Sequence, residues 1–115
     1  MDRVVPAVLA GGAAGAVARW AIGEVGWSDV TTLLVVNTVG SFVLGMVIAH
    51  WTDRDHPARL ALGIGVCGGL TTFSGLAVDL ATRLDGGAWG EAAAMTGGSL
   101  ALGLLAFLGG REVAT

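Results

Sequence analysis

The sequence "VCGGLTTFSGL", residues 66–76, lies in the middle of an otherwise apolar stretch. It combines two adjacent glycines, three hydroxyl residues and a phenylalanine at a place where a buried helix would simply continue. Glycine weakens a helix, and short hydroxyl side chains compete for backbone hydrogen bonds. What such residues do at this position depends on the solvent around them, and the rest of the chain defines that solvent.

The composition indicates that the chain is surrounded by a lipid bilayer. Of the 115 residues, 54% are hydrophobic and only 13% are charged, and the mean hydropathy is +0.76. Soluble domains carry about 25% charged residues. A soluble chain of this length cannot hide so much apolar surface in one small core.

Four apolar stretches are long enough to cross a membrane, for which roughly 20 residues are needed. They cover about residues 4–23, 31–51, 58–84 and 88–110. All four tryptophans fall near the ends of these spans, where their amphipathic rings favour the headgroup level. The sequence therefore predicts an all-α membrane protein, a single four-span membrane domain over residues 1–115 with a break in the third span.

Several other classes find little support. The N-terminal 18 residues faintly resemble a secretory signal, but everything after them is apolar, so cleavage would release no soluble product. Neither His50 nor His56 lies in the apolar part of a span, and no nucleophile or metal-ligand spacing points to an enzyme. Cys67 has no partner for a disulfide and is interpreted as a small packing residue. A net charge of −3 argues against nucleic acid as a partner.

Polar residues inside the spans are expensive in hydrocarbon and usually face a bundle interior or a wet cavity. They are Arg19, Asn37, Thr38, Ser41, Thr71, Thr72, Ser74, Asp79, Thr96 and Ser99. Taken singly, Asn37 is equally explained by one interhelical hydrogen bond, and Arg19 by snorkelling to the interface. Thr96 and Ser99 would extend a polar track on the fourth span.

The stretch at residues 66–76 is best explained as a break that binds an ion. A broken membrane helix exposes carbonyls at one half-helix end and N–H groups at the next, and both bind ions. Gly68 and Gly69 are expected to permit the turn, and the hydroxyls add donors and acceptors. Phe73 offers its electropositive ring edge to an anion. The alternative is a Gly–Ser kink packed against a neighbouring helix.

Three strings, "GGAAGAVARW", "LLVVNTVGSFVLG" and "GVCGGLTTFS", together resemble the CrcB/Fluc family of small fluoride channels in order, spacing and placement on the spans. The resemblance covers nearly the whole chain. It implies a passive fluoride-selective channel in a bacterial cell membrane, which exports fluoride and so confers fluoride resistance. It also implies an antiparallel dimer in the lipid with two fluoride pathways, and no nucleic acid as a partner.

The resemblance also assigns residues. Asn37, Phe73 and Ser74 would lie along the fluoride pathway, and Arg19 and Thr72 would support it.

A structural sodium ion would lie at the centre of the dimer interface, held by backbone carbonyls of Gly68 and Thr71 from both subunits. This ion is the only cofactor that the resemblance implies.

The chain departs from the family's typical "TTFSTF", because Gly75 and Leu76 replace the second threonine–phenylalanine pair. Leu76 keeps the bulk but loses the aromatic edge, so one of the two aromatic contacts to the anion that the resemblance implies stays an open question. If both termini share a side, that side carries four arginines and the other side one or two, which favours one fixed orientation. Both features fit a subunit that needs a homologous partner, so homodimer and heterodimer remain open.

Two other classes stay in view. A small multidrug exporter has similar length and four spans, but its proton-coupled chemistry needs a carboxylate in the first span, where none exists. Asp79, the only acid plausibly inside a span, is either a proton site, a vestibule residue or a helix-end carboxylate. A non-conducting membrane assembly subunit, held together by small-residue faces, is the third class.

Overall fold

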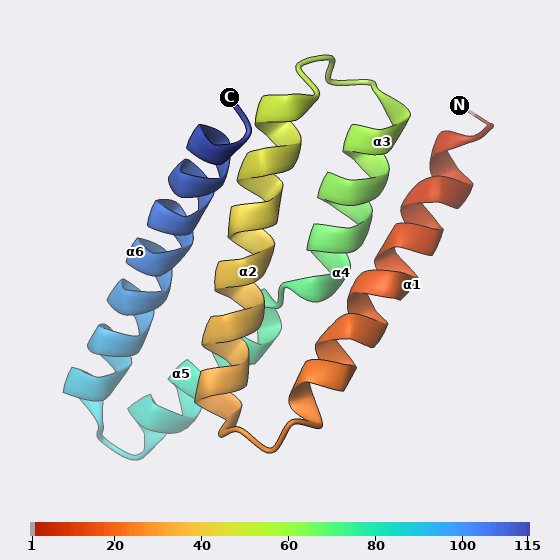
Figure 1. The fold of residues 1–115 in the computed structure, drawn as a ribbon. Helices are drawn as coiled ribbons and strands as arrows, with labels where there is room; N and C mark the ends of the chain where they lie inside the picture. The colour runs from red at the N-terminus through yellow and green to blue at the C-terminus, as the bar shows by residue number, and fades with distance from the viewer. Residues whose placement is uncertain (1) are drawn as a thin grey trace.

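The computed structural model describes residues 2–115 and contains four helices long and apolar enough to cross a membrane (Figure 1). They are α1 (Val4–Gly23), α2 (Asp29–His50), the interrupted segment Pro57–Asp85, and α6 (Trp89–Val113). The fold class predicted from the sequence is confirmed. The fourth helix continues to Val113, past the expected end at residue 110.

The third span is built from unequal pieces. Its first half comprises α3 (Pro57–Arg59), the π-helical segment η1 (Leu60–Cys67) and α4 (Gly68–Leu70), and its second half is α5 (Phe73–Asp85). Between the halves, Thr71 and Thr72 adopt extended backbone angles, with φ −80°, ψ 157° and φ −145°, ψ 115°. The predicted break is therefore present.

The expectation that Gly68 and Gly69 make the turn is wrong. Gly68 has helical angles, φ −64° and ψ −37°, and Gly69 belongs to the same α-helical turn. The chain leaves the helix through two threonines in extended conformations, which any residue adopts without strain. Gly69 serves helix packing instead, because an added Cβ there would meet the carbonyl oxygen of Gly12, whereas one added to Gly68 would meet nothing within 4 Å.

Two glycine seams bring helix backbones into close approach. A Cβ atom added to Gly15 on α1 would meet the carbonyl oxygen of Val66, and one added to Gly69 would meet the carbonyl oxygen of Gly12. On the other side of the molecule, a Cβ at Gly45 of α2 would meet the Phe107 carbonyl oxygen of α6. Small residues at such contacts let membrane helices pack without a hydrophobic driving force.

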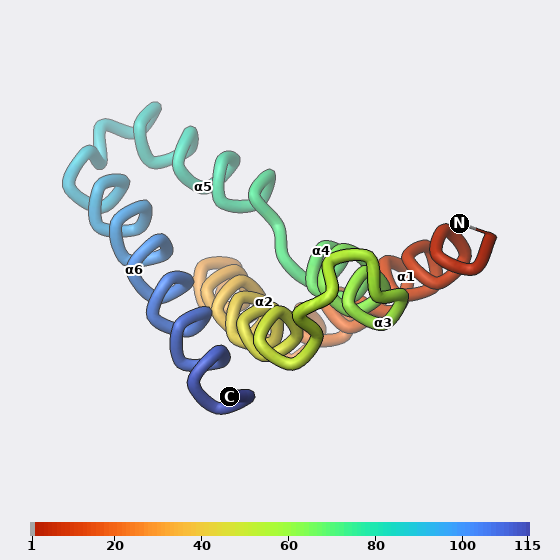
Figure 2. The backbone as a smooth tube through the Cα atoms, turned by 90° about the horizontal axis from the view of Figure 1, so that it is seen from above, coloured from red at the N-terminus to blue at the C-terminus, as the bar shows by residue number. Residues whose placement is uncertain are grey.

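The seams divide the chain into two helix pairs. α1 packs mainly against η1 and α4, and α2 packs mainly against α6. Figure 2 shows α5 leaving the first pair at the break and crossing towards the start of α6. The start of α1, the end of α6 and the connection between α2 and α3 lie at one end of the molecule, and the other two connections lie at the opposite end (Figure 1).

Local signals fix the helix ends. Ser28 caps α2 by accepting a hydrogen bond from the backbone N–H of Thr31 at 3.2 Å, a usual N-cap role for serine. Pro57 begins α3, where its missing N–H costs nothing. Arg59 donates to the carbonyls of Trp51 and Thr52 at 3.0 and 3.2 Å, which ties down the α2–α3 connection.

Little of the apolar side-chain area is buried within one chain. The buried hydrophobic residues are Leu33, Val36, Val47, Cys67, Leu70, Leu76, Ala92 and Met95. Large apolar side chains on the outer faces of α1 and α6, such as Leu9 and Leu105, remain mostly exposed. A soluble monomer does not expose contiguous apolar faces of this extent. Lipid or another subunit must cover them.

Candidate functional site

Asn37 of α2 clamps the break in the third span. Its Oδ1 accepts a hydrogen bond from the backbone N–H of Thr72 at 2.8 Å, and its Nδ2 donates to the carbonyl of the same residue at 3.1 Å. The amide thus satisfies both backbone groups of Thr72, which its extended conformation removes from the helix. Because an unpaired backbone group costs several kcal/mol in hydrocarbon, this pairing makes the break tolerable at membrane depth.

Arg19 of α1 supports the break from the other side. Its Nη1 donates to the carbonyl of Thr71 at 3.0 Å. The two residues of the break are therefore held by two different helices, Thr71 by α1 and Thr72 by α2. Interface snorkelling does not account for this contact, since the guanidinium is turned to a backbone carbonyl of the third span.

The hydroxyls at the break complete the half-helix ends. Thr71 Oγ1 donates to the Cys67 carbonyl at 2.9 Å, near the end of the first half. Thr72 Oγ1 accepts from the backbone N–H of Gly75 at 3.1 Å and so caps α5. The same hydroxyl shares a hydrogen bond with Ser74 Oγ at 3.1 Å. The N-terminus of α5, the positive end of its dipole, therefore lies beside a pair of hydroxyls.

Opposite to α5, the first half of the span ends in carbonyl groups. In an unbroken helix the Gly68 carbonyl would accept from the N–H of Thr72. That N–H donates to Asn37 instead, and within residues 2–115 no other backbone donor outside a helix reaches Gly68. Gly68 is also exposed in the single chain. The break thus presents a free carbonyl on one side and a helix N-terminus on the other.

Two surface grooves meet at Thr72. The first has a volume of about 330 Å³, and its lining includes Asn37, Ser41, Gly68, Thr71, Thr72, Phe73 and Leu76. The second, of about 510 Å³, is lined by Asp29, Thr72, Ser74, Gly75, Val78, Asp79 and Thr82. The structure therefore distributes the predicted pathway residues: Asn37 and Phe73 line the first groove, and Ser74 lines the second.

Phe73 and Leu76 differ in their surroundings. The Phe73 side chain is 82% exposed, whereas Leu76 is only 9% exposed and packs with Leu33 and Met95. Leu76, which stands where the family pattern has its second phenylalanine, is thus part of the small core between α2, α5 and α6. Phe73 is exposed on the surface of the single chain, where it lines the first groove.

Thr96 and Ser99 on α6 do not line either groove at the break. Thr96 Oγ1 donates to the carbonyl of Ala92 in its own helix at 2.9 Å. Ser99 Oγ is buried and has no hydrogen-bond partner among the described residues. Among the described residues of one chain, Thr96 and Ser99 therefore make no contact that would extend the polar track along α6 to the break.

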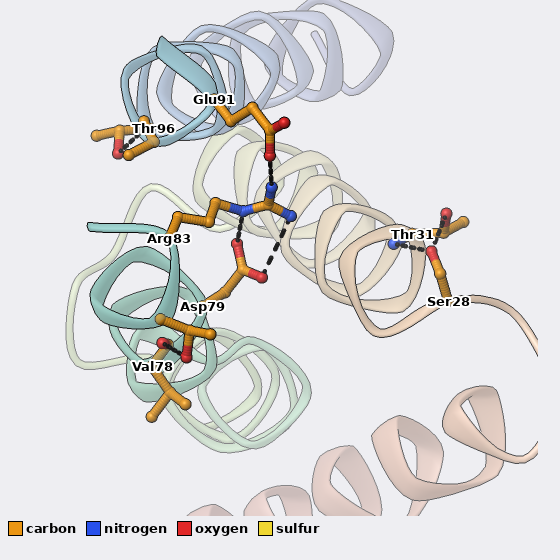
Figure 3. Close-up of polar contacts among 9 residues, drawn as sticks. Ser28, Thr31, Val78, Asp79, Arg83, Glu91 and Thr96 are labelled. Atoms are coloured by element: carbon orange, nitrogen blue, oxygen red, sulfur yellow. Dashed lines mark hydrogen bonds and ion pairs between the residues drawn. The ribbon is translucent and has the colours of Figure 1, made fainter. Parts of the chain in front are cut away.

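A charged cluster near the second groove was not anticipated from the sequence. Figure 3 shows Arg83 lying between Asp79 on its own helix and Glu91 on α6. Its Nε is 2.8 Å from Asp79 Oδ2, and its Nη1 is 2.6 Å from Glu91 Oε2. The four-residue spacing of Asp79 and Arg83 is a signal that could have predicted the first pair. In the part of the chain that the structure describes, no group of three His, Cys, Asp or Glu residues could hold a metal ion.

These features define a class: a small four-span membrane protein whose third span is interrupted by a clamped polar break, as in channels and transporters. A family model described as "CrcB-like protein, Camphor Resistance (CrcB)" matches residues 6–111. The chain belongs to this family.

Curated relatives agree with the assignment. The chain is 41% identical over 112 residues to a "Fluoride-specific ion channel FluC" of Thermus thermophilus, covering 90% of this chain and 88% of that protein. It is 40% identical over 111 residues to "Fluoride-specific ion channel FluC 1" of Mycobacterium bovis, covering 90% and 84%. A Rhodococcus jostii protein with the same name as the latter is 46% identical over 85 residues, or 74% and 66% of the two chains. The resemblance noted in the sequence is confirmed, and the chain is a multi-pass membrane protein of bacterial type.

Proposed function

We propose that this protein is a passive fluoride-selective channel that lets fluoride leave the cell and so lowers its cytoplasmic concentration. Membership of the family and the names of its relatives support this function. The observation that carries it within this chain is the clamp of Asn37 on Thr72, which holds a non-helical backbone at membrane depth beside the N-terminus of α5.

The chemistry of the break suits a small, strongly hydrated anion. A channel must replace the water of fluoride with hydrogen-bond donors that bind it favourably but weakly enough to release it. The Asn37 amide uses one N–H on the Thr72 carbonyl and keeps a second one. The hydroxyls of Thr72 and Ser74 and the free N–H groups at the start of α5 add further donors without a deep positive trap.

Phe73 would act at the mouth of the first groove. Its ring edge carries partial positive charge, and its 82% exposure leaves that edge accessible in the single chain. A side chain of this size, exposed beside a polar break, suggests that a second subunit completes the pathway.

The two carbonyls assigned to a sodium ion are chemically suited to it. Gly68 offers an oxygen that the break has freed from its helical donor. The Thr71 oxygen accepts from Arg19 and keeps its second lone pair. Backbone carbonyls at a half-helix end are ligands for Na⁺, so the donor set fits. One chain supplies only part of a coordination shell, and sodium would supply charge and cross-linking where two subunits meet.

We therefore propose an antiparallel dimer in the membrane, formed either by two copies or with a homologous subunit. The exposed Gly68 and Phe73 mark the face that needs a partner. The replacement of the second phenylalanine by Leu76 and the arginine bias still fit a heterodimeric subunit. A small multidrug exporter is the weaker alternative, because α1 lacks a carboxylate within its span and Asp79 is engaged by Arg83.

The test is fluoride efflux from liposomes that contain only this purified chain, with chloride as the control anion. Rapid efflux of fluoride but not chloride supports a working homodimer. Absence of efflux, followed by efflux after adding a homologous subunit from the same genome, supports the heterodimer. Absence of efflux in both cases overturns the proposed function.

A further inference from the structure

The second groove presents an electrostatic problem for an anion. Hydroxyls of Thr72, Ser74 and Thr82 line it together with the carboxylates of Asp29 and Asp79. An anion approaching Ser74 through this groove meets two groups of its own charge. If a carboxylate and a monovalent anion are about 8 Å apart in a medium of effective dielectric constant roughly 40, the carboxylate lowers the local concentration of the anion about fivefold.

The whole end of the molecule around this groove is acidic. Its helix ends carry four carboxylates, those of Glu24, Asp29, Asp85 and Glu91, and Asp79 lies in the middle of α5. Among the described residues at this end, one basic side chain stands among these carboxylates, that of Arg83. Arg19 lies deeper and is committed to the Thr71 carbonyl.

Arg83 is placed to neutralise the groove's inner carboxylate. Its Nε donates to Asp79 Oδ2 at 2.8 Å and its Nη2 to Oδ1 at 3.4 Å, a two-point contact that fixes the carboxylate plane (Figure 3). The side chains of Arg83 and Asp79 are 24% and 23% exposed. Solvent therefore screens this pair less than a fully exposed surface pair.

The same guanidinium also spans two helices. Its Nη1 donates to Glu91 of α6 at 2.6 Å, so Arg83 links α5, which carries Ser74, to the start of α6. Glu91 is 69% exposed, which makes this second contact the weaker one. The ion pair between Arg83 and Asp79 therefore contributes more to the electrostatic potential inside the groove than the pair with Glu91.

We infer that Arg83 is a positioning residue of fluoride permeation, because it neutralises and orients Asp79, whose carboxylate lines the anion's approach to Ser74. This inference rests on the proposed function. It assigns the four-residue pair a role in the flux of an anion, beyond linking two helices.

The experiment compares fluoride efflux from liposomes for the wild-type chain and for Arg83→Gln, Asp79→Asn/Arg83→Gln and Arg111→Gln. If the wild type needs its homologous subunit, the same partner is added throughout. At low salt, Arg83→Gln should lower efflux about five- to tenfold, since Asp79 is then left uncompensated. In 1 M potassium isethionate the loss should shrink to about twofold or less, because the Debye length is then about 3 Å. The matched control Arg111→Gln removes an exposed arginine at the opposite end and should change efflux little.

The double variant separates charge from structure. If Arg83 acts by neutralising Asp79, then Asp79→Asn/Arg83→Gln should recover efflux to within about twofold of the wild type. Equal loss in the single and double variants, or a loss unaffected by salt, would show a purely structural link and overturn the inference. Unchanged efflux in Arg83→Gln overturns it too. A wild-type chain without fluoride efflux, alone or with its partner, would instead overturn the proposed function, so the two failures are distinguishable.

Discussion

The two halves of the third span carry opposite kinds of residue. From Leu60 to Leu70 every residue is apolar or glycine, whereas residues 71–85 contain hydroxyl, carboxylate and guanidinium side chains. The first half packs along α1 through glycines, so its backbone is fixed by close contact. The second half leaves that contact and lines the second groove. The first half therefore fixes where the span lies against α1, and the second half supplies most of its polar side chains.

The junction between the halves depends on both neighbours. Packing against α1 places the end of the first half, and Arg19 reaches it from the same helix. Asn37 then fixes the direction in which the chain continues. Substitutions at the Asn37 clamp should therefore impair conduction, whereas substitutions at the glycine seam should impair folding.

The largest effect is expected for Asn37→Ala. It leaves the N–H and C=O of Thr72 without partners, at roughly 1.4 kcal/mol for each lost bond, and should lower fluoride efflux by on the order of 100-fold. The measurement is efflux from liposomes, alongside size-exclusion chromatography of the variant in detergent. A chain that still elutes as the wild type but does not conduct would locate the effect at the break.

Thr38→Val is the matched control for this variant. Thr38 is the adjacent polar residue of α2, and it lines neither of the two grooves at the break. Its efflux should stay close to that of the wild type. If Asn37→Ala conducts as well as Thr38→Val, the clamp is not needed for the pathway.

The next effect is a loss of stability in Gly15→Ala. The added methyl group would meet the Val66 carbonyl oxygen, which belongs to the backbone and cannot move aside as a side chain does. Overpacking of this kind should lower the free energy of unfolding by about 2 kcal/mol. Unfolding in mixtures of mild detergent and sodium dodecyl sulfate measures it.

Gly97→Ala makes the same chemical change where an added Cβ meets nothing within 4 Å in the single chain. Its unfolding curve should match that of the wild type or lie slightly above it, as alanine favours helix. Equal losses for both variants would mean that the seam between α1 and the first half does not fix the break.

Much of the fold was predictable from the sequence, because span length and tryptophan placement report directly on the bilayer. The break was predictable from its hydroxyls, but not its position, since Gly68 and Gly69 stay helical. The paired contact of Asn37 with Thr72 joins residues 35 positions apart. No local pattern encodes such a contact, although both residues were singled out by type. Which groove each side chain faces depends on how α5 diverges, and that is set by packing between helices.

The smallest effect is expected for Leu76→Phe, which restores the aromatic residue of the family pattern. If Leu76 marked a damaged pathway, the variant should raise fluoride efflux several-fold. The structure favours another result, because Leu76 is 9% exposed and packs with Leu33 and Met95. A larger ring there should lower the free energy of unfolding by about 1 kcal/mol and change efflux less than about twofold. Phe73→Leu provides the contrast, since that ring is 82% exposed and its loss should reduce efflux without lowering stability. A gain of efflux in Leu76→Phe with unchanged stability would show that the second half of the span turns this position towards the ion.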